Sequence, residues 1–234
     1  MVADAPELHV RESRFGTWFI HTWFWTHYVV EAAVADLARM IPEPRESFAT
    51  IVDVGCGWGL ELSLMERRFH PRRLVAIDID AKMVDGARAE ASRQGLTVEF
   101  QQTSASQIAL SERSVDMIFC HQTFHHLVEQ AAALREFYRV LKPGGVLMFA
   151  ESTRKFIFSW PIRLLFRHPM ESQRNAAEYI AMIRESGFSI DPSAISYPYL
   201  WWSRPDGGML EYWFGIAPRR VREETLINLV AVKR

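Results

Sequence analysis

Two acids flank a glycine-rich stretch, and their spacing predicts a nucleotide-like pocket. Asp53 ends an apolar run and is followed by Gly55, Gly57 and Gly59, while Asp78 ends the next apolar run, about 20 residues after the glycines. Glycines allow positive φ angles and let a ligand approach the main chain closely. An acid at the position of Asp78 is typical of a ribose site, and a carboxylate at Asp53 favours an ammonium or sulfonium group over a pyrophosphate. The pattern therefore predicts a ligand with an adenosine-like ribose and a positive charge.

The elements that must position these residues alternate between strands and helices. Apolar, β-branched runs predict strands, and the periodic segments between them predict helices. Such alternation predicts a parallel sheet covered on both faces, with ligands at the carboxyl ends of the strands. The expected strands cover 50–54, 73–78, 97–101, 115–120 and 145–150, and the expected helices cover 59–69, 81–94 and 129–140.

Four segments, in the right order, resemble the motifs of class I S-adenosylmethionine (SAM) methyltransferases. They are residues 53–59, 75–80, 114–120 and 137–147, so the resemblance covers the chain between the first and the fifth expected strand. It implies a Rossmann-like α/β fold with seven mostly parallel strands, an antiparallel last strand and helices on both faces. It also implies SAM as the cofactor and methyl transfer as the activity.

The resemblance implies a role for individual residues of the pocket. Asp53 is expected near the SAM ammonium, Asp78 at the ribose hydroxyls and Ile79 against the adenine. The full implied cofactor set is Asp53, Gly55, Cys56, Gly57, Asp78, Ile79, Ser104, Ala105, Cys120 and His121.

The expected adenine and methionine ends of the pocket differ in how closely they follow the family. Ser104 and Ala105 stand where many relatives have an acid and a small residue, and a serine accepts a hydrogen bond without charge assistance. Cys120 and His121 leave the fourth strand and are expected beside the methionine part of SAM.

The sequence identifies no catalytic residue, because a general base is needed only if the acceptor must lose a proton early. His126, Tyr28 and Glu151 are the candidates, with a solvated loop acid as the equal alternative for Glu151. His125 and His126 are expected to point in different directions as pocket-wall or structural residues. Zinc-type spacing is missing, so no metal site is expected.

The chain divides into three expected zones. Residues 1–44 form an aromatic helical cap or lid, residues 45–151 the SAM-binding core, and residues 152–234 a substrate-side insertion with the last two strands of the same domain. In the third zone we expect a helix over 176–186 and strands near 195–202 and 225–232. In the first zone, three- and four-residue steps predict one helical face before Pro42 and Pro44, made of Ile20, Trp23, His27, Val30, Val34, Leu37 and Ile41.

Composition limits the partners of the protein. The chain has 234 residues and a formal net charge of −1, which gives no general attraction to nucleic acid. Two cysteines and an N-terminus interrupted by Asp4, Glu7 and Glu12 predict a cytoplasmic protein without a disulfide framework. Aromatic segments on both sides of the core predict a small, apolar, aromatic or lipid-like acceptor, with rings that only seal SAM inside the pocket as the nearly equal alternative.

Two other functions remain open from the sequence. The glycines would also suit an NAD-dependent oxidoreductase, although Asp53 disfavours it. The aromatic N-terminus would suit a non-catalytic methyltransferase-fold protein at a membrane surface, and peripheral membrane contact is compatible with the enzyme as well. Nothing in the sequence predicts the oligomeric state.

Overall fold

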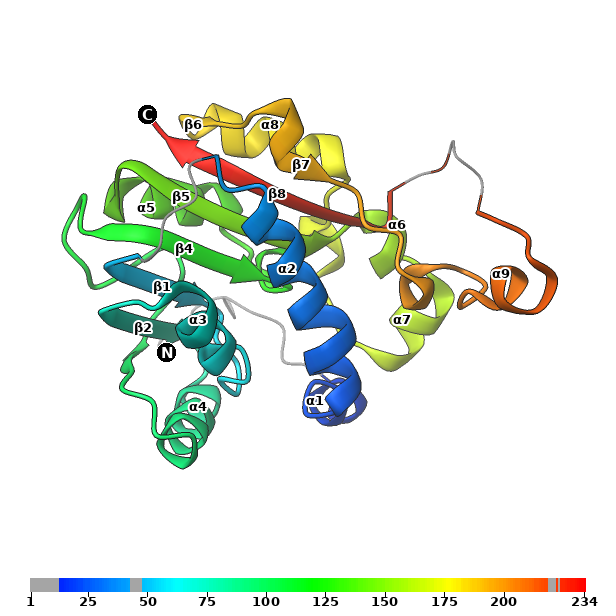
Figure 1. Cartoon of the computed structure of the whole chain (residues 1–234), viewed down its shortest axis with the longest axis horizontal. Helices are drawn as coiled ribbons and strands as arrows, with labels where there is room; N and C mark the ends of the chain where they lie inside the picture. The colour runs from blue at the N-terminus through cyan, green and yellow to red at the C-terminus, as the bar shows by residue number, and fades with distance from the viewer. Residues whose placement is uncertain (1–12, 43–47, 219–221, 223) are drawn as a thin grey trace, which may run out of the picture.

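A computed structural model describes residues 13–42, 48–218, 222 and 224–234. Its sheet has the order β3-β2-β1-β4-β5-β8-β6, with β7 also paired to β8 (Figure 1). The parallel strands are β1 (Thr50–Val54), β2 (Arg73–Asp78), β3 (Glu99–Gln102), β4 (Val115–His121) and β5 (Leu141–Ser152), and the antiparallel ones are β6 (Phe188–Ser189), β7 (Ile195–Ser196) and β8 (Leu226–Lys233). The predicted fold class is confirmed. The sheet has eight strands rather than seven because both β6 and β7 pair with β8.

Alternation along the strands explains why helices cover both faces of the sheet. In β1, Ile51 packs in the apolar cluster that contains α2, α3 and α4, whereas Val52 packs in the cluster that contains α5 and α8. Successive strand residues point to opposite faces, so a sheet covered on both sides needs a continuous apolar run. These helices are α2 (Glu31–Arg39), α3 (Leu62–Phe69), α4 (Ala81–Arg93), α5 (Gln130–Val140) and α8 (Ala176–Glu185).

The N-terminal helical segment buries the predicted face from Val30 onward but not before it. After α1 (Arg14–Phe19), a π-helical turn η1 (Trp25–Val30) leads directly into α2. Its i→i+5 hydrogen bonds change the angular spacing of the side chains, so a regular helical repeat does not continue through it. Trp23 is 68% exposed and His27 is exposed, whereas Leu37 is buried against the sheet. The predicted face is therefore wrong at Trp23 and His27.

The remaining helical elements are short. They are η2 (Phe124–His126), α6 (Arg154–Ile157), α7 (Trp160–Leu165), η3 (Met170–Ser172), η4 (Pro192–Ala194), η5 (Trp201–Ser203) and α9 (Met209–Phe214). The strand expected over 195–202 is only two residues long, because the chain leaves the sheet after Ser196. It turns at η5 toward the N-terminal segment, where Nε1 of Trp202 donates to the carbonyl of Tyr28 over 3.2 Å.

Two features of the chain as a whole bear on its organisation. None of the helices in the described part of the chain has the length and apolar character needed to cross a membrane. The predicted boundary between cap and core, at Pro44, lies outside the described residues. The three-zone division of the chain therefore stays a prediction.

Candidate active site

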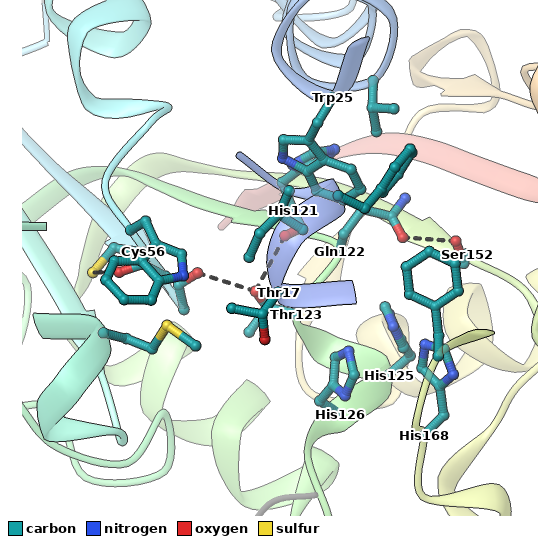
Figure 2. Close-up of a pocket in the computed structure, with 18 of the residues that line it drawn as sticks. Thr17, Trp25, Cys56, His121, Gln122, Thr123, His125, His126, Ser152 and His168 are labelled. Atoms are coloured by element: carbon teal, nitrogen blue, oxygen red, sulfur yellow. Dashed lines mark hydrogen bonds between the residues drawn. The ribbon is translucent and has the colours of Figure 1, made fainter. Parts of the chain in front are cut away.

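The carboxyl ends of the parallel strands border a cavity of about 680 Å³ (Figure 2). In the loop after β1, Gly55 and Gly57 have φ angles of +73° and +50°, which favour glycine. The amides of Gly55 and Cys56 donate to the carbonyl of Ile77 over 2.8 and 3.0 Å, and the Gly57 amide donates to Oδ2 of Asp78 over 3.0 Å. A Cβ on Gly57 would meet no atom within 4 Å. The loop is thus fixed to the end of β2 while its backbone stays open to a ligand.

Three carboxylates surround this loop. Asp53 is buried, and neither of its carboxylate oxygens has a hydrogen-bond partner among the described residues. Burial and the nearby carboxylates of Glu61 and Asp78 raise the pKa of Asp53 well above its usual range. Burial and the same three acids also raise the pKa of the Cys56 thiol. A cation near the loop would stabilise the ionised carboxylates, so the site fits a ligand with an ammonium or sulfonium group.

Glu61 is a site residue that the sequence did not reveal. It is the N-cap residue of α3, and its Oε1 accepts a hydrogen bond from Nδ1 of His121 over 2.7 Å. Both side chains are buried and line the cavity. An acid at the start of the helix after the glycine loop is favoured by the helix dipole, which is the only available signal. Nothing in the spacing pairs Glu61 with a histidine on β4.

Most of the predicted cofactor residues line the cavity, but two do not. Asp53 lies behind the glycine loop, and Cys120 packs in the apolar cluster beneath α5. Cys120 and His121 are neighbours on β4, so their side chains point to opposite faces. The side chain of Cys120 therefore does not reach the cavity, and its place beside the methionine part of SAM stays a prediction. The predicted residues that line the cavity are Gly55, Cys56, Gly57, Asp78, Ile79, Ser104, Ala105 and His121.

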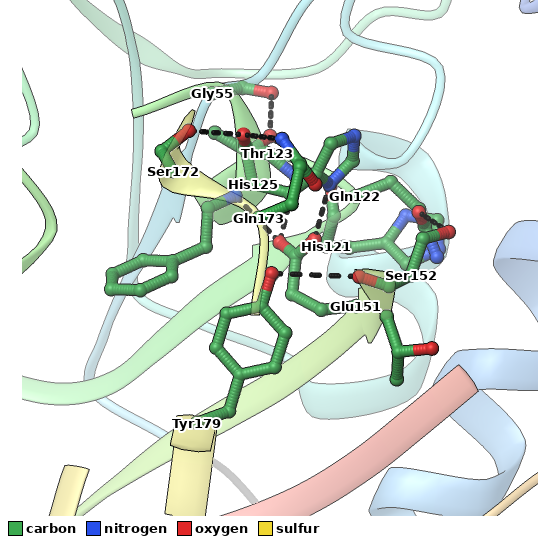
Figure 3. Close-up of polar contacts among 12 residues, drawn as sticks. Gly55, His121, Gln122, Thr123, His125, Glu151, Ser152, Ser172, Gln173 and Tyr179 are labelled. Carbon is green, nitrogen blue, oxygen red and sulfur yellow. Dashed lines mark hydrogen bonds and ion pairs between the residues drawn. The ribbon is translucent and has the colours of Figure 1, made fainter. Parts of the chain in front are cut away.

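Two of the three predicted base candidates lie outside the cavity lining. Tyr28 is on the surface, where Trp23, His27 and other aromatic rings surround it. Glu151 is fully buried and accepts hydrogen bonds from the backbone amide of Thr123 over 2.8 Å and from Nδ1 of His125 over 2.5 Å (Figure 3). Through these hydrogen bonds Glu151 fixes the loop after β4. Neither Tyr28 nor Glu151 lines the cavity, so their roles as bases stay predictions, whereas the alternative of a solvated Glu151 is wrong because the side chain is fully buried.

The third candidate, His126, belongs to a cluster of three histidines. His125, His126 and His168 line the cavity, and their ring centroids are 4.2, 5.1 and 4.9 Å apart (Figure 2). The expectation that His125 and His126 point in different directions is wrong, because the 3-10 turn η2 brings both rings to one cluster. Burial and the neighbouring His125 lower the pKa of His168 to about 3.

Gln122 is a further cavity residue that the sequence did not reveal. Its φ angle is +49°, which is unusual for a residue other than glycine, and its Oε1 accepts a hydrogen bond from Ser152 Oγ over 2.6 Å. Backbone strain of this kind costs about 1–3 kcal/mol and is concentrated at functional sites.

The part of the cavity that faces the N-terminal segment is largely aromatic. Phe19 lies 5.7 Å from Phe166 between ring centroids, and Ser13 Oγ donates to the carbonyl of Leu165 over 2.5 Å. The N-terminal segment and the chain after β5 therefore meet over the cavity. The aromatic lining residues are Phe15, Phe19, Phe24, Trp25, Trp58, Phe156, Phe166, Trp201 and Trp202.

Several known proteins are similar to this chain in sequence or in fold. Residues 52–149 match the model of a family described as a methyltransferase domain. A probable S-adenosylmethionine-dependent methyltransferase of Mycolicibacterium smegmatis is 30% identical over 170 residues, which are 72% of this chain and 60% of that protein. A ubiquinone biosynthesis O-methyltransferase of Histophilus somni is 28% identical over 142 residues, which are 58% of this chain and 54% of that protein. The crystal structure of a SAM-dependent methyltransferase from Aquifex aeolicus is similar with a TM-score of 0.63 and 20% identity, and covers 92% of this chain and 96% of that one.

The matches and the geometry of the site indicate the same class of protein. The chain spans 54–60% of the length of these two curated relatives. The sheet order, the glycine loop and the family match place residues 52–149 among the class I SAM-dependent methyltransferase domains, so the predicted resemblance is confirmed. The cofactor that the family and the relatives' names indicate is SAM.

Proposed function

We propose that this protein is a SAM-dependent methyltransferase that acts on a small, apolar, aromatic or lipid-like acceptor and releases S-adenosylhomocysteine. The observation that carries the proposal is the glycine loop after β1. Its backbone is accessible at Gly57, and the carboxylates of Asp53, Glu61 and Asp78 lie close to it. SAM combines a ribose with an ammonium and a sulfonium group, which are the features that such a loop would select.

The residues at the loop take distinct roles in this proposal. Asp78 binds the ribose hydroxyls, and Ile79, Ser104 and Ala105 line the adenine end. Asp53 acts through its charge from behind the loop. SAM supplies an electrophilic methyl group, so the chain's own tasks are to orient the acceptor, hold it in line with that group and exclude water.

The aromatic part of the cavity supports an apolar acceptor. Rings from the N-terminal segment and from the chain after β5 cover the side of the cavity beyond the glycine loop, where they would bury a planar or aliphatic molecule. A nucleic acid would need a broad basic surface, which the net charge of −1 does not favour. The similarity to a ubiquinone biosynthesis O-methyltransferase agrees with a molecule of this class.

An NAD-dependent oxidoreductase is the less favourable alternative. The pyrophosphate of NAD would lie against the glycine loop, where Asp53, Glu61 and Asp78 would repel it. The antiparallel β8 between β5 and β6 is also the feature expected of the methyltransferase sheet.

Contact with a membrane surface would bring a lipid-like acceptor to the cavity. Helix α9 has no buried residue, and Trp213 and Phe214 are 69% and 72% exposed. Figure 1 shows α9 projecting at the end of the molecule where α6 and α7 lie. Trp160 and Leu164 of α7 are also exposed. Exposed aromatic helices suit a lipid interface, so we include a peripheral membrane contact through α9 in the proposal.

Methylation of a cell extract tests the proposed function. The full chain is incubated with methyl-labelled SAM and with extract that has been separated into small molecules, lipids, protein and nucleic acid. We expect label in the small-molecule or lipid fraction, and none there with the Gly57→Val variant. Label only in protein or nucleic acid would contradict the proposed acceptor class.

A further inference from the structure

The cluster of His125, His126 and His168 has the composition of a metal site. We infer that these three side chains bind one divalent transition-metal ion at the acceptor end of the cavity. One ligand nitrogen from each residue lies within 4.8 Å of the other two, and Figure 2 shows the three rings grouped away from Cys56 and the glycine loop. The cluster needs no residue outside the described chain.

The distances between the rings are compatible with one shared ion. A metal–imidazole bond of 2.0–2.1 Å places two nitrogens of a tetrahedral site about 3.4 Å apart. The nitrogens lie within 4.8 Å of one another, so a ring needs to move by at most about an ångström. His126 and His168 are only partly buried, and modest side-chain rotations bring them closer.

The hydrogen bond between His125 and Glu151 prepares His125 to bind a metal. A carboxylate only accepts hydrogen bonds, so Nδ1 of His125 carries the proton at the 2.5 Å contact, and Nε2 of the neutral ring keeps its lone pair. Glu151 is itself fixed by the amides of Thr123 and Phe124, over 2.8 and 2.6 Å (Figure 3). Metal-binding histidines commonly have a carboxylate partner of this kind, which sets the tautomer and raises the basicity of the ligand.

A buried glutamine joins the two chain segments that carry the histidines. Nε2 of Gln173 donates to the carbonyl of His125 over 2.9 Å and to the carbonyl of Pro169 over 2.7 Å. Pro169 follows His168 directly, so this side chain holds His168 beside the η2 turn. Gln130 adds a second link, because its Nε2 donates to the carbonyls of Phe124 and Ser172 over 3.1 and 2.9 Å. The two backbone segments that carry the histidines are therefore held together before any ion binds.

The ligand set predicts both the kind of ion and its open positions. Imidazole nitrogens suit Zn²⁺, Co²⁺, Ni²⁺ or Fe²⁺ better than Mg²⁺ or Ca²⁺. Three protein ligands leave at least one position for an exogenous oxygen, as in catalytic zinc sites. All three rings line the cavity, so that position is accessible to a molecule inside it.

The open position also narrows the acceptor class, a step that rests on the proposed function. A phenol or enol hydroxyl bound to the ion would lose its proton to solvent water at a lower pH than in the free molecule. The oxygen lone pair then forms the new bond to the methyl carbon, and the electrons of the broken carbon–sulfur bond go to sulfur, which becomes a neutral thioether. The predicted acceptor is therefore an aromatic or enolic hydroxyl compound.

Titration with Zn²⁺ and Co²⁺ tests the metal site directly. The tag-free full chain, stripped with a chelator, is titrated by calorimetry with Zn²⁺ and by absorption with Co²⁺. We expect one ion per chain, and at least 100-fold weaker binding for His168→Phe and His126→Ala. His168→Phe keeps the ring volume in the cluster, and His27→Ala removes an exposed histidine outside the cavity as the matched control.

SAM binding is measured on the same samples, so that the two proposals can fail separately. Saturable metal binding without SAM binding would support the ion site and overturn the methyltransferase assignment. A folded wild-type chain that binds no Zn²⁺ or Co²⁺ would overturn the metal site alone. So would a folded His168→Phe chain, checked by circular dichroism, that binds the ion as tightly as the wild type. If His168→Phe does not fold, His126→Ala decides between the same outcomes.

Discussion

Oε2 of Glu151 lies 2.5 Å from Nδ1 of His125, and both side chains are buried. Glu151 does not line the cavity, but through this contact it orients His125, which does. Glu151 therefore acts through His125. A residue at the end of β5 that resembles a catalytic acid in sequence is a positioning residue in the structure.

Glu151→Gln is expected to reverse the tautomer of His125. The amide oxygen can still accept from the backbone amides of Thr123 and Phe124, while its NH₂ group faces Nδ1 of His125. His125 must then accept at Nδ1 and carry its proton on Nε2, which cannot bind a metal. We expect Zn²⁺ affinity to fall about 10–100-fold, measured by calorimetry.

SAM affinity serves as the control for this variant. It should stay within a factor of two of the wild type, because the glycine loop is not touched. Unchanged Zn²⁺ affinity in a folded Glu151→Gln chain would contradict the role assigned to Glu151.

Asp53→Asn is expected to stabilise the protein and weaken SAM binding. Above its unfolded pKa the wild type must either keep a charge buried beside Glu61 and Asp78 or take up a proton at Asp53, and both cost free energy, whereas asparagine does neither. We expect a Tm about 2–4 °C higher for the variant at pH 8, equivalent to ~1 kcal/mol. SAM binding should weaken about 10-fold, because one of the charges that attract the cation is lost.

The pH dependence follows from the raised pKa of Asp53. A folded pKa above the unfolded value of about 3.9 stabilises the protein below that pH, and this stabilisation is lost as the pH rises through the folded pKa. The difference in Tm should therefore shrink toward pH 4. Thermal unfolding at several pH values measures it, with the exposed Asp85→Asn as the control. A lower Tm than wild type at pH 8 would refute the account of Asp53.

Trp213→Ser with Phe214→Ser is expected to abolish vesicle binding and leave SAM binding unchanged. The two rings are exposed on α9 and do not line the cavity. Flotation with phosphatidylglycerol-containing vesicles measures the effect, and Tyr197→Ser removes an exposed aromatic ring elsewhere as the control. A double variant that floats as well as the wild type would rule out α9 as the contact.

The parallel core could be predicted because its signals are local. β1 and β2 begin and end at the predicted residues. The apolar run marks the length of each strand, and the glycine or acid at its end marks where the strand stops. The helix predicted over 59–69 begins later, at Leu62, because Gly59 has a φ angle of +73° and keeps the loop in turns.

The rest of the site depends on contacts between distant segments. His168 reaches His125 only through the fold of the chain after β5 and the hydrogen bonds of Gln173, neither of which leaves a periodic pattern. The π-helical turn at Trp25–Val30 likewise changes the buried face of a segment whose sequence reads as a regular helix. Tertiary contacts, rather than local preference, determine both features.

Calorimetric titration with SAM of the wild type, Gly57→Val and Gly95→Val tests whether the glycine loop after β1 binds the cofactor. Both glycines have positive φ angles, +50° and +69°, and a Cβ at either meets no atom within 4 Å, so the backbone strain is matched. Only Gly57 lines the cavity. We expect saturable SAM binding by the wild type and Gly95→Val and at least 10-fold weaker binding by Gly57→Val. A folded wild type that binds no SAM, or equal affinity in all three proteins, would contradict it.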